Sequence, residues 1–329
     1  MKKLLSNLLV LTLATVFGFI LLEAAYRFYL FGWDAFSIEK VNSVNALGLS
    51  GLLQSSSNPD LVFELTPNVD TYFKLVPFQT NSHGLRDKEY SLDKPDGVFR
   101  VAVLGDSFTL PSGVAIEDAF HSLLEDRLNS GNESVRYEFI NFAVGAYTLQ
   151  QYLSAIRDKA MEYDPDLILI GFCAGNDHKV FLPDRFPERY RPKGRTYPFY
   201  GSFVMNAIAL KLLESQVEEE RGHLTDRQAR YLEQVFGELA ALSKAENIPV
   251  VLVYLSNQEE NYKPIEELAL ANGIEHFLDA SSAFRGTDLS DYRILPIDNH
   301  PNTKAHQIFA DRIYEYLVRE DLLRLPGTE

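Results

Sequence analysis

Short apolar runs alternate with helical periods through most of the chain. Strand-like runs occupy Phe99–Leu104, Tyr137–Phe142, Leu167–Phe172 and Pro249–Leu255, with a weaker fifth at Gly273–Leu278. Helical periods occupy Ala119–Leu128, Leu149–Tyr163, Arg227–Asn247, Ile265–Ala271 and Thr303–Val318. Fully buried parallel strands appear as continuous apolar segments, whereas amphipathic helices show a period near 3.6. The alternation therefore predicts an α/β fold with a doubly wound parallel sheet and helices on both faces.

The N-terminus is apolar and has no polar face. The run Leu4–Leu22 carries no charge, and as a helix it would reach roughly 28 Å, close to the hydrocarbon thickness of a bilayer. Lys2 and Lys3 precede it, which favours an N-in orientation with the rest of the chain exported. A cleaved signal peptide is the competing interpretation, but its apolar region is usually shorter and no small-residue cleavage site stands before Glu23. We therefore expect an uncleaved transmembrane signal anchor.

Local composition divides the chain into four expected parts. Residues 1–25 form the anchor, and residues 26–58 form a juxtamembrane linker that is aromatic first and then rich in Ser and Asn. Residues 59–98 alternate short apolar stretches with turn residues, which indicates a small β-rich collar. Residues 99–329 form the α/β domain. This division predicts a single-pass membrane protein whose main domain lies in the periplasm or outside the cell.

Composition narrows the class of partner. The 329 residues are 46% hydrophobic, enough for a substantial core, and 31 Lys and Arg against 46 Asp and Glu give a net charge of −15. Phosphate binding needs clustered cations, so nucleic acid is not an expected partner. The one cysteine, Cys173, excludes an intramolecular disulfide and a cysteine-based zinc cluster. No histidine stands in a metal-ligand spacing, and no metal is expected.

Ligands of doubly wound sheets bind beyond the carboxyl ends of the strands, so candidate chemistry should follow strand ends. The first strand runs into Gly105-Asp106-Ser107. A serine between a tight strand exit and a helix start presents its hydroxyl clear of the sheet, where neighbouring backbone N–H groups can stabilise an oxyanion. A helix N-cap is an equally good interpretation of Asp and Ser at this position.

Two further strand ends offer hydrogen-bond donors. Gly145 follows the second strand, where a glycine lets the backbone approach a ligand and present its N–H. Asn176 follows the third strand, and its side chain can donate to developing negative charge while staying uncharged. A plain βα turn at Gly145 and an Asn-Asp turn at Asn176 are the structural alternatives. Cys173, next to Asn176, is interpreted as buried packing at a strand end.

A candidate base stands before the last helix. Asp298 and His300 are two apart, so in an extended segment they point to the same side. The carboxylate can then reach Nδ1 of the imidazole and leave Nε2 to take a proton from a serine. A Pro-bearing turn that leads to a helix N-cap at Asn302 is the alternative.

The order and spacing of these residues resemble the SGNH/GDSL hydrolase superfamily, over roughly Phe99 to Leu317. Ser107 matches the nucleophile, Gly145 the second-block glycine, Asn176 the Gly-x-Asn-Asp asparagine and His300 the last-block histidine. One residue, rather than the two of many relatives, separates Asp298 from His300. The Asp-x-His-Pro-Asn form looks like a subgroup associated with cell-surface polysaccharides. The resemblance implies a flavodoxin-like three-layer α/β/α sandwich and ester chemistry without metal or organic cofactor.

In the mechanism that follows from these roles, Ser107, Asp298 and His300 are catalytic, and Ser107, Gly145 and Asn176 form the oxyanion hole. The expected function is a membrane-anchored serine esterase that hydrolyses acyl esters, with acetyl as the expected group and a cell-surface glycan as the expected substrate. Other small esters remain possible substrates. An O-acetyltransferase of the same fold and a non-catalytic polysaccharide-binding or assembly protein are the alternatives.

Two other segments have candidate roles. After Asn176, basic and aromatic residues interleave, and Arg189, Tyr190 and Arg191 are the substrate-binding candidates of a lid over the site. A solvated loop is the alternative. Upstream, Asn81-Ser82-His83-Gly84-Leu85-Arg86 is similar to a segment of membrane-anchored relatives, and Arg86 is interpreted as a structural pin rather than a substrate clamp.

Overall fold

The computed structural model describes residues 2–45, 52–131, 134–175, 177–178, 201–214, 224–256 and 259–323. At its centre lies a five-stranded sheet in the order β6-β5-β7-β8-β9, with every neighbouring pair parallel. The strands are β5 (Val98–Gly105), β6 (Arg136–Asn141), β7 (Leu167–Phe172), β8 (Val250–Tyr254) and β9 (His276–Asp279). In chain order this is 2-1-3-4-5, the strand order of flavodoxin-like folds.

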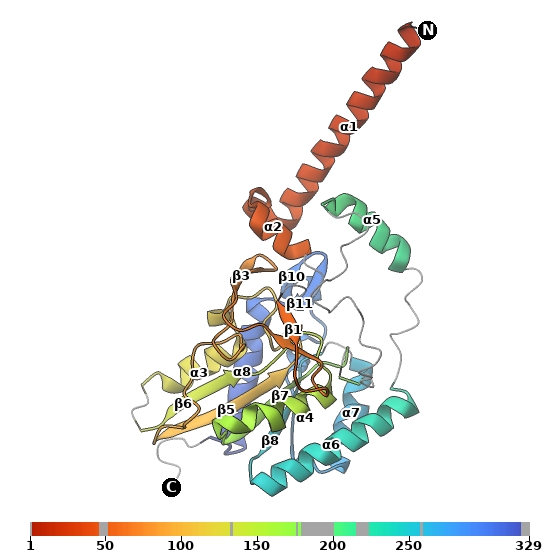
Figure 1. Cartoon of the computed structure of the whole chain (residues 1–329). Coiled ribbons are helices and arrows are strands. Elements are labelled where there is room, and N and C mark those ends of the chain that lie inside the picture. The colour runs from red at the N-terminus through yellow and green to blue at the C-terminus, as the bar shows by residue number, and fades with distance from the viewer. Residues whose placement is uncertain are drawn as a thin grey trace.

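Helices cover both faces of this sheet (Figure 1). One face packs against α4 (Leu149–Asp158), α6 (Asp226–Glu246) and α7 (Glu259–Ala271). The other packs against α3 (Phe120–Asn129) and α8 (Thr303–Arg319). The result is a three-layer α/β/α sandwich, so the predicted fold class is confirmed.

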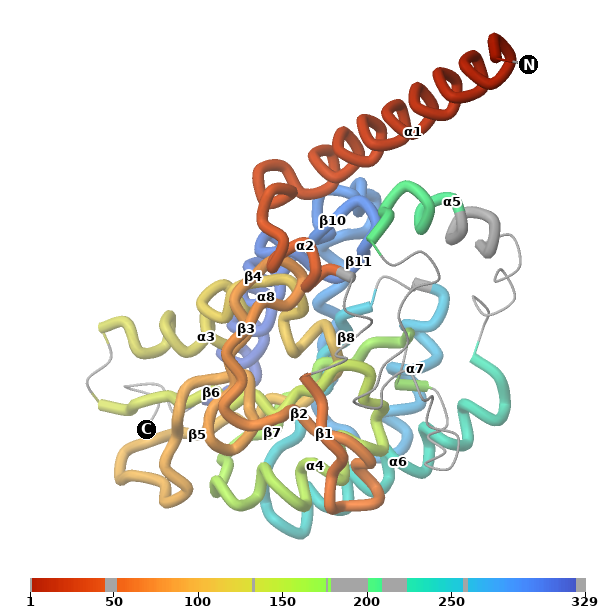
Figure 2. Tube along the Cα trace, turned by 45° about the horizontal axis from the view of Figure 1, so that its top comes forward, coloured from red at the N-terminus to blue at the C-terminus, as the bar shows by residue number. Residues whose placement is uncertain are grey.

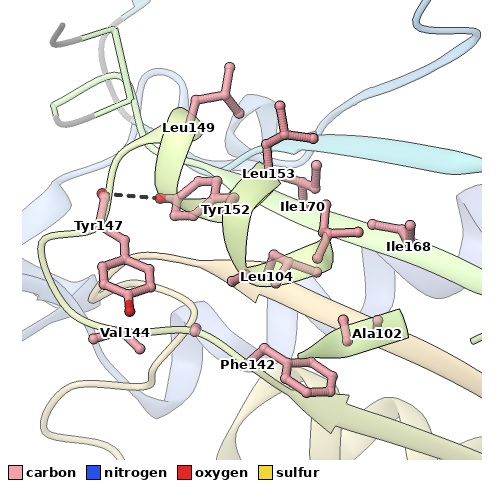
Figure 3. Packing of buried hydrophobic residues seen from close by; sticks show 14 of the residues in the cluster. Ala102, Leu104, Phe142, Val144, Tyr147, Leu149, Tyr152, Leu153, Ile168 and Ile170 are labelled. Carbon is pink, nitrogen blue, oxygen red and sulfur yellow. Dashed lines mark hydrogen bonds between the residues drawn. The ribbon is translucent and has the colours of Figure 1, made fainter. Parts of the chain in front are cut away.

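The two faces of the central strands form two separate cores. In β5, Ala102 and Leu104 enter the core on the α4 side, whereas Val101 and Val103 enter the core on the α3 side. Figure 3 shows the first of these cores, where Leu104 and Ile170 lie beneath Leu153 of α4. Since successive side chains of a strand point to opposite faces, a strand buried on both faces must be apolar throughout. This explains why the apolar runs located the strands to within three residues at either end.

Two helices differ from their predicted ranges. The period expected over Leu149–Tyr163 is divided between α4 and a 3₁₀ turn, η3 (Ala160–Tyr163). Lys159 interrupts it, with φ −129° and ψ −53°. The helix expected at Ile265–Ala271 begins earlier, at Glu259, and continues past Pro264.

The chain before the sheet folds into two β-hairpins. They are β1 (Leu53–Ser55) with β2 (Phe63–Leu65), and β3 (Asp70–Phe73) with β4 (Val76–Gln79). Phe63, Phe73 and Phe78 are buried in the core on the α4 side. The hairpins are therefore packed onto the main domain. The remaining short elements are η2 (Ile116–Asp118), η7 (Ser281–Phe284), η8 (Leu289–Tyr292) and the antiparallel pair β10 (Arg293–Leu295) and β11 (Asp298–Pro301).

The N-terminal helix α1 (Lys2–Phe31) projects from the body of the molecule (Figures 1 and 2). It is long and apolar enough to cross a membrane, and Leu4 on it is 74% exposed. Beyond it follow η1 (Gly32–Phe36) and α2 (Ile38–Asn45), and α5 (Phe203–Glu214) lies beside its C-terminal end.

The C-terminal end of α1 packs against the domain in a small apolar cluster, here called the anchor cluster. Its buried members come from α1, α2, α5 and β10, and they are Leu30, Phe31, Val41, Phe203 and Leu295. Leu75, from the β3–β4 turn, is half-buried against it. The base of α1 thus shares this cluster with β10, which pairs with the strand that contains Asp298 and His300.

Candidate active site

The loops that follow β5, β6 and β7 leave the sheet at its carboxyl edge. Because β5 lies between β6 and β7, the connections from β5 and β7 run in opposite directions along the sheet. Such a switch in strand order opens a crevice at the carboxyl edge, where open α/β sheets bind ligands. Ser107, Gly145 and Cys173 stand in these three loops, so the topology gathers the predicted blocks at one place.

Ser107 lies in a tight turn immediately after β5. The buried Asp106 carboxylate accepts the Phe108 N–H at 2.9 Å, and the Ser107 carbonyl accepts the Ser112 N–H at 3.2 Å. Thr109, fully buried, places its side chain against Gly105 and Gly171, which are paired neighbours in β5 and β7. Both glycines are needed here because a Cβ atom at either position would collide with Thr109.

His300 and Asp298 lie in β11 and point to the same side. Nε2 of His300 is 2.8 Å from Oγ of Ser107, and Nδ1 of His300 is 2.5 Å from Oδ1 of Asp298. The Phe108 ring packs edge-on against the imidazole, with the ring centroids 5.6 Å apart. The fold therefore brings these three predicted residues into one hydrogen-bonded chain, although 193 positions separate Ser107 from His300.

A fourth charged residue, Lys74, joins this chain and was not expected from the sequence. Its Nζ lies 2.7 Å from Oδ2 of Asp298 and 2.9 Å from Nδ1 of His300. Burial raises the pKa of the Asp298 carboxyl, but the hydrogen bonds from His300 and Lys74 and the electrostatic attraction of these two neighbours outweigh it, and the net pKa is well below the usual range. The Asp298 carboxyl is therefore ionised at neutral pH. Burial also lowers the pKa of Lys74, against the opposing pull of Asp298.

Gly145 follows β6 in a loop that returns to the end of β5. The Asn141 side chain accepts the Ala143 N–H at 2.9 Å, and the Val144 N–H donates to the Gly105 carbonyl at 3.2 Å. This places Gly145 next to the Ser107 turn. Within the described part of the chain, neither the Ser107 nor the Gly145 N–H donates to another group.

Asn176 lies outside the described residues, as do Arg189, Tyr190 and Arg191. The loop before and after Asn176 is held by the buried Asp177, whose carboxylate accepts the Cys173 N–H and the Tyr152 hydroxyl, both at 2.6 Å. Burial raises the pKa of the Cys173 thiol well above its usual range. A thiol that stays protonated is a poor nucleophile, in agreement with its interpretation as strand-end packing.

A cavity of about 450 Å³ lies beside His300. Its lining combines aromatic, aliphatic and polar side chains from the Ser107 turn, the β8 end, α7, η7, η8, β10, β11 and α8, among them Phe108, Leu255, Phe284, Tyr292, Arg293 and Asn299. Aromatic faces together with a few polar groups are the usual lining of a small-molecule site.

The segment Asn81–Arg86 has a structural role. The Asn81 carboxamide oxygen accepts the N–H groups of His83 and Leu85 at 3.0 and 2.9 Å. Gly84 has φ +75°, and a Cβ atom at this position would lie 2.7 Å from the Leu65 carbonyl oxygen. The buried Arg86 guanidinium donates to the carbonyls of Leu110, Pro111 and Val114 at 2.6–2.8 Å. Arg86 thus pins the segment that follows β4 to the segment that follows Ser107.

Comparisons with known proteins return matches among solved structures only. No protein-family model matches the chain, and no curated protein matches it. One similar structure is a two-domain esterase active on acetylated mannans, co-crystallised with mannopentaose, with 15% identity, a TM-score of 0.46 and 70% of this chain covered. The match spans 51% of that esterase's own length.

Two further similar structures are covered by this chain over nearly their whole length. A psychrotrophic esterase, EstA, from Pseudoalteromonas sp. has 16% identity and a TM-score of 0.40, with 67% of this chain and 97% of its own covered. The acetyl xylan esterase AlAXEase has 18% identity and a TM-score of 0.42, with 66% and 98% covered. All three of these solved proteins are esterases by name.

Proposed function

We propose that this chain is a membrane-anchored serine esterase with Ser107 as nucleophile, His300 as general base and Asp298 as the residue that orients His300. The observation that carries the proposal is the unbroken hydrogen-bonded chain from Ser107 Oγ through the imidazole to Asp298. A serine hydroxyl is a weak nucleophile on its own and needs such an adjacent, oriented base. The sequence blocks that resemble SGNH/GDSL hydrolases support the same assignment.

The mechanism follows from these positions. Nε2 of His300 takes the Ser107 proton as Oγ attacks the ester carbonyl, and the Nδ1–H stays hydrogen-bonded to Asp298. The oxyanion that forms accepts hydrogen bonds from the Ser107 and Gly145 N–H groups, and the Asn176 amide is the proposed third donor. Collapse releases the alcohol, which takes the proton from His300. Water, deprotonated by the same imidazole, hydrolyses the acyl-enzyme and restores Ser107.

We infer that the substrate is an acylated glycan and that the acyl group is acetyl. The cavity beside His300 supports this because sugar rings stack on aromatic side chains such as Tyr292 while their hydroxyls bond to polar ones such as Asn299. Arg189, Tyr190 and Arg191 complete the proposal as further substrate-binding residues.

The proposed location is the outer surface of a membrane that α1 spans. Lys2 and Lys3 at its start favour an N-in orientation, which places the catalytic domain in the periplasm or outside the cell. The anchor cluster supports an orientation of the site toward the membrane, because it joins the base of α1 to β10. The site then faces the membrane side of the domain.

The test uses the full-length protein in detergent micelles, with phenyl acetate and an acetylated glycan as substrates. Wild type should release acetate, and Ser107→Ala and His300→Ala should each lower kcat by about 10⁴-fold or more. Ser130→Ala, which alters a serine at the far end of α3, is the matched control and should be unaffected. Equal rates for wild type and Ser107→Ala would refute the esterase proposal. Acetate transfer to added oligosaccharide instead of water would indicate the acetyltransferase alternative.

A further inference from the structure

Three aromatic rings form an exposed cluster beside the end of α1. The ring centroid of Phe28 in α1 lies 5.5 Å from that of Trp33 and 6.4 Å from that of Phe36, both in η1, and the last two are 5.9 Å apart. Trp33 is 80% exposed and Phe36 is 74% exposed. Ile38, the first residue of α2, is also 80% exposed. These four residues are here called the aromatic patch. Contiguous exposed apolar surface of this kind marks a site of interaction with a protein or a membrane.

The short helix η1 has one side in the protein and one side outside it. Its Ala35 packs inward against the anchor cluster, whereas Trp33 and Phe36 are exposed. The turn from η1 into α2 is closed by a hydrogen bond from the Ser37 N–H to the Asp34 carbonyl at 3.0 Å. The exposed rings therefore belong to an ordered element with apolar support beneath it.

The charged residues at this level of α1 are directed toward α5. Glu23 and Arg27 form an ion pair at 2.8 Å. The Glu23 carboxylate also accepts the N–H groups of Phe203 and Val204, at the start of α5, at 2.9 and 3.1 Å. Phe28 follows five residues after Glu23 and one after Arg27, so at 3.6 residues per turn it lies on a different face of the helix. The face of α1 that contributes to the aromatic patch thus contains neither of these charges.

The length of α1 places the aromatic patch at the edge of the membrane that this helix spans. The uncharged run ends at Leu22, and Phe28 follows six residues later, about 9 Å along the helix axis. The headgroup layer outside the hydrocarbon core is about 5–8 Å thick on each side. Helical side chains lean toward the N-terminus of their helix, so the Phe28 ring lies closer to the core than its Cα atom does. Trp33 contacts that ring, and tryptophan is enriched at this depth of membrane proteins.

We propose that the aromatic patch is a membrane-docking surface, which lies in the headgroup layer of the leaflet next to the catalytic domain. The partner is the lipid itself, because the patch continues directly from a helix that is long and apolar enough to cross a membrane. The inference rests on the proposed location of α1 in a membrane. A single helix leaves a domain free to tilt about its end, whereas a second lipid contact on one side of that helix restrains the tilt.

The aromatic patch is connected to the active site through α2. This helix begins at Ile38, in the patch, and its Ser43 Oγ accepts the Leu75 N–H of the β3–β4 turn at 3.0 Å. Lys74, in the same turn, contacts Asp298 at 2.7 Å. The elements between the patch and the site are short and joined by hydrogen bonds. A docked patch therefore holds the active site at a fixed orientation to the lipid surface.

The experiment uses Trp33 as its probe, because it is the one tryptophan of the chain. Full-length protein is reconstituted into phosphatidylcholine vesicles whose lipid carries bromine either near the headgroup end or near the methyl end of the acyl chains. Bromine quenches a tryptophan that it contacts, and iodide added to the buffer quenches a tryptophan in water. Flotation of the vesicles shows whether the protein is bound to them.

The matched control moves the tryptophan away from the membrane. It is the double variant Trp33→Phe with Leu92→Trp. Leu92 is exposed, and its carbonyl accepts the Arg100 guanidinium at 3.0 Å near the start of β5. This position lies at the amino edge of the sheet, opposite the edge that contains the active site. The control keeps α1 and an aromatic ring at position 33.

We expect Trp33 to be quenched by brominated lipid, more strongly when the bromine lies near the headgroup end than when it lies near the methyl end. Iodide should quench Trp33 less in vesicles than in the urea-unfolded protein. The tryptophan of the control should instead be quenched by iodide and be insensitive to both brominated lipids. Both proteins should float with the vesicles.

Three outcomes would overturn the inference. If the protein floats but Trp33 is quenched by iodide and not by bromine, α1 anchors the chain and the aromatic patch does not dock. If neither agent quenches Trp33, protein covers the patch, as in a contact between two copies of the chain. If the protein does not float, the proposed location of α1 is wrong as well. Acetate release from phenyl acetate by the same vesicles, compared with Ser107→Ala, tests the esterase assignment whatever the result for Trp33.

Discussion

The position of the Ser107 turn depends on two glycines that face one buried threonine, and Gly171→Ala tests this dependence. A Cβ atom at Gly171 would overlap Oγ of Thr109 and lie 2.8 Å from Cδ1 of Leu255. Thr109 cannot withdraw easily, since it is fully buried and its carbonyl accepts the Asn141 amide at 3.0 Å. The added methyl group should therefore push the turn that holds Ser107.

The expected magnitude is that of overpacking a core. Forcing a methyl group into such a site costs about 2–3 kcal/mol, which in a domain of this size lowers Tm by roughly 5–10 °C. A displacement of Ser107 by about 1 Å would lower kcat by about 10²-fold. Gly237→Ala is the matched control, because no atom lies within 4 Å of a Cβ placed there in α6. It should leave Tm unchanged or raise it slightly.

The assay is a double-mutant cycle with Thr109→Ala, scored by thermal unfolding and by kcat. Thr109→Ala removes the hydroxyl that collides, so the double variant should recover at least about 1 kcal/mol relative to the sum of the single changes. If Gly171→Ala is tolerated as well as Gly237→Ala, or if the two changes are additive, the packing argument is wrong.

Three other predictions concern stability and positioning. Arg86→Met leaves three buried carbonyls without their donor and should lower the free energy of unfolding by about 3–5 kcal/mol; an unchanged Tm would exclude the pin. Burial lowers the pKa of His121 and of His306 to about 3, whereas a histidine in the unfolded chain has a pKa near 6.5. Each histidine therefore favours the folded state above pH 6.5, and this contribution is lost as the pH falls toward 3. Between pH 6.5 and 5 the loss is about 2 kcal/mol for each. His306→Phe should therefore reduce the acid loss by that amount in unfolding measured across this range, and an identical pH slope would contradict it. Asp177→Ala should lower kcat by about 10²-fold with little change in KM, because the loop before Asn176 loses both hydrogen bonds to that carboxylate; unaltered kinetics would show that the loop needs no such support.

Much of the fold was predictable because a segment that is buried on all sides is apolar at every position. A strand covered on both faces, such as β7, has no polar position, and so Leu167–Phe172 was located without error at either end. The pairing of Ser107 with His300 was within reach through the resemblance to SGNH/GDSL hydrolases and not through strand ends, because His300 lies in β11, outside the five-stranded sheet.

The position of Lys74 beside Asp298 could not be predicted from the sequence, for a physical reason. It lies in the β3–β4 hairpin turn, which has no periodic pattern, and its place beside Asp298 depends on how this hairpin packs against the α/β domain. That docking rests on non-local contacts, such as Arg86 with the carbonyls after Ser107 and Leu75 with the anchor cluster. The spacing of residues along the chain does not predict such contacts.

Covalent trapping of Ser107 tests its proposed role as nucleophile most directly. A fluorophosphonate reacts preferentially with a serine that an adjacent base activates, and the modified peptide is identified by mass spectrometry. We expect one adduct, on Ser107, that forms in the full-length wild type and is lost in His300→Ala. No adduct on Ser107, or an adduct that forms equally in His300→Ala, would contradict it.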